Sequence, residues 1–375
     1  MAAVRCSHLC WITYIFLLLV RVYPIRLTNV IEYNAASIVV PEKMDAVAVI
    51  SPNKGQKVSH PDYSKANVVV AGDGSGNFKS ITDAIAKAPK NSKKPYVIHI
   101  KKGVYNEYIT IDKPNIALVG DGMDVTNITG SRSVKKMKNT ALSATVIIQA
   151  PKFVAIDLTI ENSSPHRHGQ AVALSMDSDQ SVLYKCAIRG NQDTLYAYSG
   201  RQLYKDSVIT GTVDFVFGYA TVIFQNCKIL ARNATTTVIA ASGRNSTNDN
   251  SGFVFQFCNI FGNADFANKL TFLGRPWGLY SRIVVMQSSL DNYINPRGWI
   301  SWGTNGDSTK PPATRKPFFG EYNNKGPGSD VSNRVKWPQF HVLKSKAAKK
   351  FTVDKFLNGN TWLPATGIPY NGGLS

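Results

Sequence analysis

The sequence has few acidic residues for its number of basic ones. It contains 24 Asp and Glu against 43 Lys and Arg in 375 residues, which gives a formal net charge of +19. Such a balance predicts a polyanionic partner, and nucleic acid, an anionic membrane and an acidic polysaccharide are the three candidates. Charge alone does not choose among them.

Cysteine is also scarce. Cys6 and Cys10 lie in an apolar leader, and the rest of the chain holds Cys186, Cys227 and Cys258. Because this number is odd and the residues lack metal-ligand spacing, neither a disulfide framework nor a zinc site is predicted.

Several motifs of common enzyme classes are missing. No G-x-S-x-G elbow occurs, which disfavours a serine esterase. The run GDGSG at 72–76 lacks the Gly-Lys-Ser/Thr ending of a phosphate loop and is interpreted as a turn. His166 and His168 form H-x-H without an evident third ligand, so we interpret them as part of a solvated loop. We therefore expect no metal and no cofactor.

The chain also lacks a hydrophobic run of comfortable membrane-spanning length. The apolar run from about Leu9 to Val20 is short and is closely followed by Arg21, so residues 1–24 are interpreted as a signal peptide. An uncleaved anchor is the alternative, because no clear A-x-A cleavage site follows. Secretion of a glycoprotein also suits the four N-glycosylation sequons, which begin at Asn127, Asn162, Asn233 and Asn245.

The remaining chain divides into two parts by its pattern. Residues 25–67 show no sustained periodicity and are predicted to be an N-terminal arm or linker, whereas 68–375 are predicted to form one folded domain. Near its start, a short amphipathic helix is predicted, with one apolar face formed by Ile81, Ala84, Ile85 and Ala88.

Short β-branched and aromatic runs then recur along the chain. Aligned on their fifth residue, VAIDLTI, VLYKCAI, LYKDSVI, IFQNCKI, VFQFCNI and VVMQSSL place six residues in register: Leu158, Cys186, Ser207, Cys227, Cys258 and Ser288. Their spacings of 28, 21, 20, 31 and 30 suit one coil per repeat with turns of variable length. A β-sandwich would instead show hairpin turns every 8–12 residues or so. The pattern predicts an all-β, single-stranded parallel β-helix in which the register residues stack inside the coil.

Two aspartates keep the same place in adjacent repeats. Asp193 follows Cys186 by seven residues, and Asp214 follows Ser207 by seven. We therefore expect their carboxylates to lie about one strand spacing, roughly 4.8 Å, apart. Such closeness disfavours double ionisation, so one carboxyl can be an acid while the other is a nucleophile or base. The alternative is that each aspartate only caps a turn.

Other polar residues favour the catalytic interpretation. Gln192 precedes Asp193, Gln170 lies one coil earlier, and Arg275 occurs later in LGRPW. Amides can donate hydrogen bonds to a developing oxyanion, and an arginine can hold a carboxylate ionised through two hydrogen bonds.

At these segments the sequence closely resembles the plant pectin methylesterases, or pectinesterases. The ordered blocks are GVYNE at 103–107, GQAVAL at 169–174, QDTLY at 192–196, GTVDFVFG at 211–218 and LGRPW at 273–277. The resemblance extends from about Val68 to Leu374 and implies a right-handed β-helix. It also implies hydrolysis of homogalacturonan methyl esters, in the form of the family without the inhibitor-like pro-region.

The resemblance also assigns roles to residues. It implies that Asp214 is the nucleophile, Asp193 the proton donor and later base, and Gln192 with Gln170 the oxyanion donors. Arg275 would orient Asp214. Substrate contacts would come from Thr140, Trp277 and Trp299, although the two tryptophans could equally be packing residues.

The chain departs from the family pattern at three positions of note. Ser207 replaces the cysteine that usually pairs with the one at Cys227, Ser242 replaces a glutamine, and Tyr219 replaces an asparagine. Cys227 is therefore expected to be a free thiol.

The expected partner is methylated homogalacturonan, with a proteinaceous pectinesterase inhibitor as a further one. We expect neither nucleic acid nor, in the mature form, a membrane as partner, and we expect a secreted monomer in the cell wall. Two alternatives stay open: a different β-helix pectin enzyme such as a lyase or polygalacturonase, and a non-catalytic pectin-binding wall protein.

Overall fold

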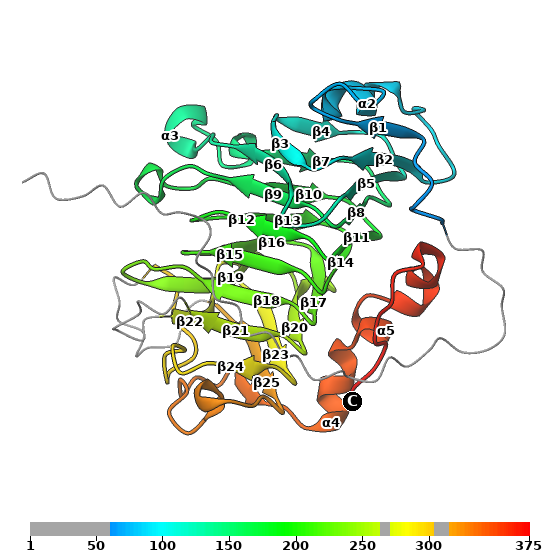
Figure 1. The fold of residues 1–375 in the computed structure, drawn as a ribbon. Coiled ribbons are helices and arrows are strands. Elements are labelled where there is room, and N and C mark those ends of the chain that lie inside the picture. The colour runs from blue at the N-terminus through cyan, green and yellow to red at the C-terminus, as the bar shows by residue number, and fades with distance from the viewer. Residues whose placement is uncertain (1–60, 263–270, 304–314) are drawn as a thin grey trace, which may run out of the picture. The chain divides into compact units, whose positions relative to one another are not determined.

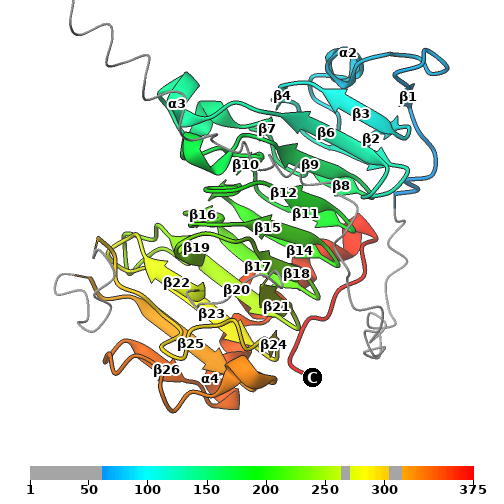
Figure 2. The ribbon, with the colours of Figure 1, turned by 60° about the vertical axis from the view of Figure 1, so that its left-hand side comes forward.

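Short apolar runs form strands throughout the computed structural model, which describes residues 61–262, 271–303 and 315–375. Over the described residues, the strands stack in parallel into three sheets of 11, 8 and 7 strands, called here sheets A, B and C, and from β2 to β22 the chain visits them in that order in each coil. This is the predicted right-handed parallel β-helix, with its coils stacked along one axis (Figures 1 and 2). The predicted fold class is confirmed.

Sheet A consists of β1 (Val68–Val70), β2 (Tyr96–Ile100), β5 (Ile116–Gly120), β8 (Val154–Ile156), β11 (Ser181–Tyr184), β14 (Arg201–Lys205), β17 (Thr221–Gln225), β20 (Gly252–Gln256), β23 (Arg282–Met286), β25 (Phe318–Tyr322) and β26 (Phe340–Val342). Sheet B consists of β3 (Gly103–Asn106), β6 (Thr126–Gly130), β9 (Thr159–Asn162), β12 (Ala187–Arg189), β15 (Val208–Gly211), β18 (Lys228–Ala231), β21 (Asn259–Gly262) and β24 (Ser289–Leu290). Sheet C consists of β4 (Ile109–Ile111), β7 (Val146–Ile148), β10 (Leu174–Asp177), β13 (Leu195–Ser199), β16 (Val216–Gly218), β19 (Thr237–Ser242) and β22 (Thr271–Pro276).

The helices in the described part of the chain are short. The α-helices are α2 (Ile81–Lys87), α3 (Val134–Met137), α4 (Ser345–Ala348) and α5 (Val353–Phe356). The 3₁₀ turns are η1 (Ala141–Ser143), η2 (His166–His168), η3 (Pro327–Ser329), η4 (Lys349–Phe351), η5 (Gly359–Thr361) and η6 (Leu363–Thr366). Helix α2 buries the predicted apolar face, and Ser80 caps its first turn by accepting a hydrogen bond from the Asp83 N–H. The predicted N-terminal helix is confirmed.

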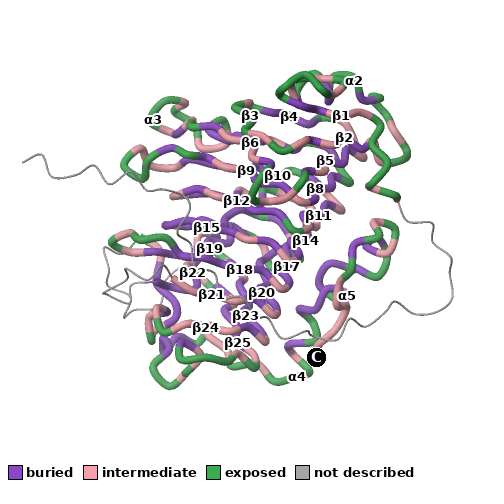
Figure 3. The backbone as a smooth tube through the Cα atoms, viewed as in Figure 1, coloured by how far each residue is buried: buried purple, intermediate pink, exposed green. Residues whose placement is uncertain are grey.

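The central strands of sheet A are mostly buried (Figure 3), and they carry apolar side chains on both faces of the sheet. Side chains alternate along a strand, so Val222 and Phe224 of β17 face the coil interior while Ile223 faces outward. The outward row is covered by the C-terminal segment, which contributes Phe351 and Trp362 to the same cluster. Two-sided burial explains why these strands show apolar runs rather than strict alternation of apolar and polar residues.

The first corner of each coil, between the sheet A and sheet B strands, is built from a repeated pair of residues. The first of the pair has a positive φ, as in Asp206 (52°) and Asn226 (56°). The second points inward, and the six residues predicted to be in register are all at most 2% exposed. Strand pairings such as Val208 with Lys228 confirm that register.

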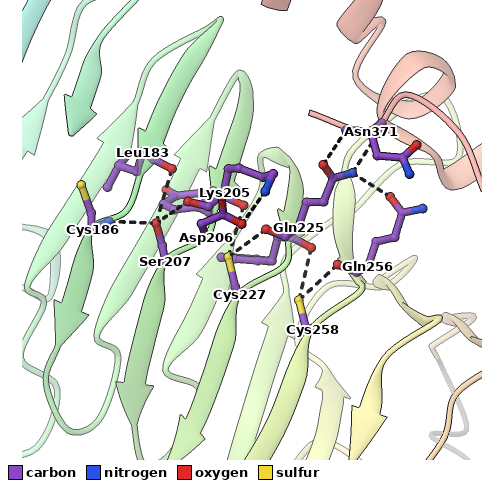
Figure 4. A network of polar contacts seen from close by, with 12 residues as sticks. Leu183, Cys186, Lys205, Asp206, Ser207, Gln225, Cys227, Gln256, Cys258 and Asn371 are labelled. Carbon is purple, nitrogen blue, oxygen red and sulfur yellow. Dashed lines mark hydrogen bonds and ion pairs between the residues drawn. The ribbon is translucent and has the colours of Figure 1, made fainter. Parts of the chain in front are cut away.

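Cys186, Cys227 and Cys258 are free and buried in this inward column, which Figure 4 shows. The thiols of Cys227 and Cys258 each donate to a carbonyl of the preceding coil, at 3.3 Å. Ser207 accepts a hydrogen bond from the Cys186 N–H at 3.1 Å and donates to the Lys205 carbonyl at 2.9 Å. The cysteines therefore act as packing residues, and the prediction that Cys227 is free is confirmed.

A second polar ladder, on the outside of sheet A, holds the C-terminus. Gln225 exchanges two 2.8 Å hydrogen bonds with the Asn371 backbone, as Figure 4 shows. Gln256 and Gln287 donate in turn to the carbonyls of Gly373 and Ser375. Alternate residues of the extended tail thus meet successive coils, because an extended chain repeats every two residues.

The sequons differ in access. Asn162 is 1% exposed, and its amide nitrogen donates to three carbonyls: Arg132, Ser143 and Val172. Asn162 is therefore unavailable to a glycan, and its role is structural. Asn233 and Asn245 are exposed. The predicted signal peptide lies outside the described residues, among which no helix is both long and apolar enough to cross a membrane.

Candidate active site

The second corner of the coil, between sheets B and C, carries the two aspartates. Asp193 and Asp214 both have positive φ, 61° and 50°. This left-handed conformation costs aspartate less than most residues, because its short polar side chain can hydrogen-bond locally. Leu195 pairs with Val216, and each aspartate lies two residues before its member of the pair. The prediction that they occupy equivalent places on adjacent coils is confirmed.

Arg275 makes a two-point contact with Asp214. Its Nε donates to Oδ1 at 2.8 Å and its Nη2 to Oδ2 at 2.5 Å. The strand register explains how the Arg275 side chain reaches Asp214, because Phe217, Ala241 and Arg275 lie in one column of sheet C. The small Ala241 between them leaves room for the guanidinium. Asp193 has no such partner among the described residues, so Arg275 distinguishes the two carboxylates.

This difference sets their protonation. Burial raises the pKa of Asp193 well above its ordinary value, and the charge of Asp214 raises it further. Burial also raises the pKa of Asp214, but the hydrogen bonds and charge of Arg275 oppose that rise directly. Of the two carboxyls, Asp193 is therefore the better suited to retain a proton, and Asp214 the better suited to ionise.

The aspartates open onto a cleft of about 560 Å³. Its walls include Thr140, Gln170, Gln192 and Trp277, so four more of the predicted site residues gather there with Asp193, Asp214 and Arg275. The amides of Gln170 and Gln192 are half-exposed and form no side-chain hydrogen bond with the described residues. They are available to a ligand above the aspartates.

The prediction that Trp299 contacts substrate is wrong. Its side chain is fully buried, stacks on Phe319 at 4.4 Å between ring centroids, and donates from Nε1 to Glu321 at 3.3 Å. The tryptophan that lines the cleft is Trp302, whose ring lies 4.4 Å from the Arg275 guanidinium carbon. Trp299 pairs with Gly274 in an isolated parallel bridge. Trp302 lies in a bend three residues further, where the alternation of an extended strand does not apply, so no sequence signal distinguished the two tryptophans.

The sequence reasoning also missed an aromatic wall of the cleft. Tyr196 and Phe217 pair in register and stack at 4.3 Å, and Tyr219 packs on Trp277 at 4.8 Å. Tyr196 and Phe217 each follow a site aspartate by three residues. That repeated offset could have identified them. Rings of this kind, with an exposed face, suit a sugar polymer.

Comparisons with known proteins agree with this geometry. The sequence profile of the family described as Pectinesterase matches residues 67–360. A pectinesterase/pectinesterase inhibitor of Prunus persica is 47% identical over 329 residues, covering 84% of this chain and 62% of the relative. The chain thus spans about three fifths of the length of such relatives.

Solved structures are similar as well. Pectin methylesterase from carrot superposes with a TM-score of 0.78 and 42% identity, over 84% of this chain and 100% of that one. A pectin methylesterase in complex with a hexasaccharide has a TM-score of 0.67 and 29% identity, over 83% of this chain and 99% of that one.

Proposed function

The chain belongs to the pectinesterase family, and we propose on that premise that it hydrolyses methyl esters of homogalacturonan to pectate and methanol. The observation that carries the proposal is the asymmetric carboxylate pair: Arg275 holds Asp214, while Asp193 is buried and no cation of the described residues bonds to it. One carboxyl is thereby prepared to attack and the other to give a proton.

The first half of the reaction forms an acyl-enzyme. An Asp214 oxygen attacks the ester carbonyl carbon, and the carbonyl electrons move to the oxygen. The amides of Gln170 and Gln192 donate to this oxyanion. As the tetrahedral intermediate collapses, the bond to methoxide breaks, and Asp193 transfers its proton to the leaving oxygen to give methanol.

The second half restores the enzyme. Asp193, now a carboxylate, takes a proton from a water molecule whose oxygen attacks the acyl carbon. The bond to Asp214 breaks, leaving an ionised Asp214 again held by Arg275 and the sugar carboxylic acid, which then loses its proton to solvent. Atoms and charge balance over both halves without a metal or cofactor.

The aromatic wall is proposed to bind the polysaccharide chain. Trp277 and Trp302, with Tyr196 and Phe217, would stack on galacturonate rings. Thr140 would contact the polysaccharide at the other end of the cleft. That the hexasaccharide complex belongs to the same fold supports a polymeric ligand.

The proposals on domain bounds, secretion and oligomeric state are based on the sequence. We propose residues 68–375 as the catalytic domain, residues 1–24 as a signal peptide for secretion to the cell wall, and a monomer as the working form. A proteinaceous inhibitor is proposed as a further partner, since names of the relatives include one.

The test is methanol release from highly methylated pectin by the wild type and by Asp214→Asn, with circular dichroism to confirm folding. We expect release by the wild type and background release by the variant. A wild type that binds pectin without releasing methanol would support the non-catalytic alternative. Loss of activity in EDTA, rescue by calcium and shortening of the polymer would support the lyase.

A further inference from the structure

A group of basic side chains lies beside the cleft, on two chain segments that contain no acidic residue. Residues 131–141 contribute Arg132, Lys135, Lys136 and Lys138, and residues 163–170 contribute Arg167, along with two histidines. Neither segment contains Asp or Glu. Lys135, Lys136, Lys138 and Arg167 are exposed, and in the part of the chain that the structure describes none of them forms an ion pair. We call this group the cationic edge.

The two segments meet in space. The Val134 N–H at the start of α3 donates to the Gln170 carbonyl at 2.8 Å. Burial, and then the charges of Lys135, Arg167 and Lys136, lower the pKa of His168, which places these cations around the end of η2. Helix α3 stands out from the coil on this side (Figures 1 and 2), and its lysines are exposed.

The same segments continue directly into the cleft wall. Asn139, Thr140 and Ala141 follow the α3 lysines, and Gln170 follows Arg167 by three residues; all four line the cleft. The far wall is different, because it holds Tyr219, Trp277 and Trp302 from later coils. A polymer lying in the cleft would therefore pass from an aromatic surface, over the aspartates, to a cationic one.

We propose that the cationic edge binds free carboxylates on galacturonate residues next to the ester in the cleft, so that partly de-esterified strands are preferred. This inference rests on the proposed function. A sugar polymer with one carboxylate per de-esterified ring is a ligand of dispersed single charges, which suits exposed lysine ammonium groups at the mouth of a cleft. Methylated rings lack that charge and suit the aromatic wall instead.

The experiment compares the wild type with a triple variant, Lys135→Gln, Lys136→Gln and Arg167→Gln. The matched control is Lys346→Gln, Lys349→Gln and Lys350→Gln, which removes three exposed charges from the C-terminal segment that packs on sheet A. Two quantities are measured: the ratio of kcat/KM on partly de-esterified pectin to that on highly methylated pectin, and the calorimetric affinity for a fully de-esterified oligogalacturonate.

We expect both quantities to fall about tenfold in the triple variant, as for the loss of three exposed ion pairs, and to stay at the wild-type value in the control. Equal values in the two variants would overturn the proposal. So would an unchanged ratio together with lost binding to anionic lipid vesicles, which would assign the edge to membranes. If the wild type released no methanol, the proposed function would be contradicted. The calorimetric affinity for the oligogalacturonate would still test the cationic edge.

Discussion

The two corners of the coil use the same backbone conformation for opposite purposes. At the first corner the left-handed position is held by Lys185, Asp206, Asn226 and Phe257 in turn, so its side-chain chemistry hardly matters. At the second corner the left-handed residues are Asp193 and Asp214, and both are nearly buried beneath the cleft. The turn at the first corner serves the stacking of coils, whereas at the second it places two carboxylates.

The difference lies in what surrounds each corner. Next to the first corner, the inward column is closed by side chains that bond only to the backbone, such as Ser207 and Cys227. Next to the second corner, the cleft leaves one side open, and Arg275 reaches in from two coils away. A repeated turn thus becomes a reactive site through neighbours contributed by other coils.

The largest effect should come from the second corner. Asp193→Asn should lower methanol release about 10²–10⁴-fold, because it removes the proposed acid and base. The rate should recover in part on an activated aryl ester, whose leaving group needs no proton, and Asp214→Asn should show no such recovery. The control is Asp206→Asn, an aspartate with the same backbone conformation at the first corner, which should keep normal activity. Recovery of Asp214→Asn alone would reverse the two roles.

A smaller effect is expected when the partner of Asp214 is removed. Burial raises the pKa of Asp214, and the hydrogen bonds and charge of Arg275 oppose that rise. In Arg275→Met that pKa should rise, and the acid-side inflection of kcat/KM should move to higher pH by about one unit or more. Arg201→Met is the control, because Arg201 makes a similar two-point contact with Asp179 away from the cleft, at 2.8 and 2.6 Å. An unchanged pH profile in Arg275→Met would contradict the assigned role.

At the first corner, changes should affect stability and leave chemistry alone. Ser207→Ala removes the acceptor of the Cys186 N–H in a buried column. It should lower the free energy of unfolding by about 1–3 kcal/mol, measured in urea. Ser345→Ala, at an exposed serine, is the control. If the column tolerated Ser207→Ala at no cost, its hydrogen bonds would not stabilise the coil.

The smallest effect concerns the left-handed residue itself. Phe257 has a φ of 56°, which is unfavourable for a bulky side chain. Phe257→Asn should raise the free energy of unfolding by up to about 1 kcal/mol, because asparagine adopts this conformation more readily. Methanol release should not change. Destabilisation by this substitution would mean that packing of the ring outweighs backbone strain.

The register of the coils was predictable from the sequence, since the fifth residues of six apolar runs became the inward column. The same register predicted the pairing of Asp193 with Asp214 through a shared offset of seven residues. Prediction from periodicity succeeds here because each coil repeats the same backbone path. Residues at equal sequence offsets from the inward column therefore occupy equivalent positions in their coils.

Only the tertiary structure decided which aromatic and basic residues surround the aspartates. Trp299 and Trp302 lie three residues apart, and yet one is buried against Phe319 while the other lines the cleft. The sequence likewise did not reveal that α3 brings Lys135 and Lys136 beside Arg167. Local periodicity determines the path within a coil, but the direction of a side chain after an irregular loop depends on contacts with distant coils. Those contacts exist only once the chain is folded.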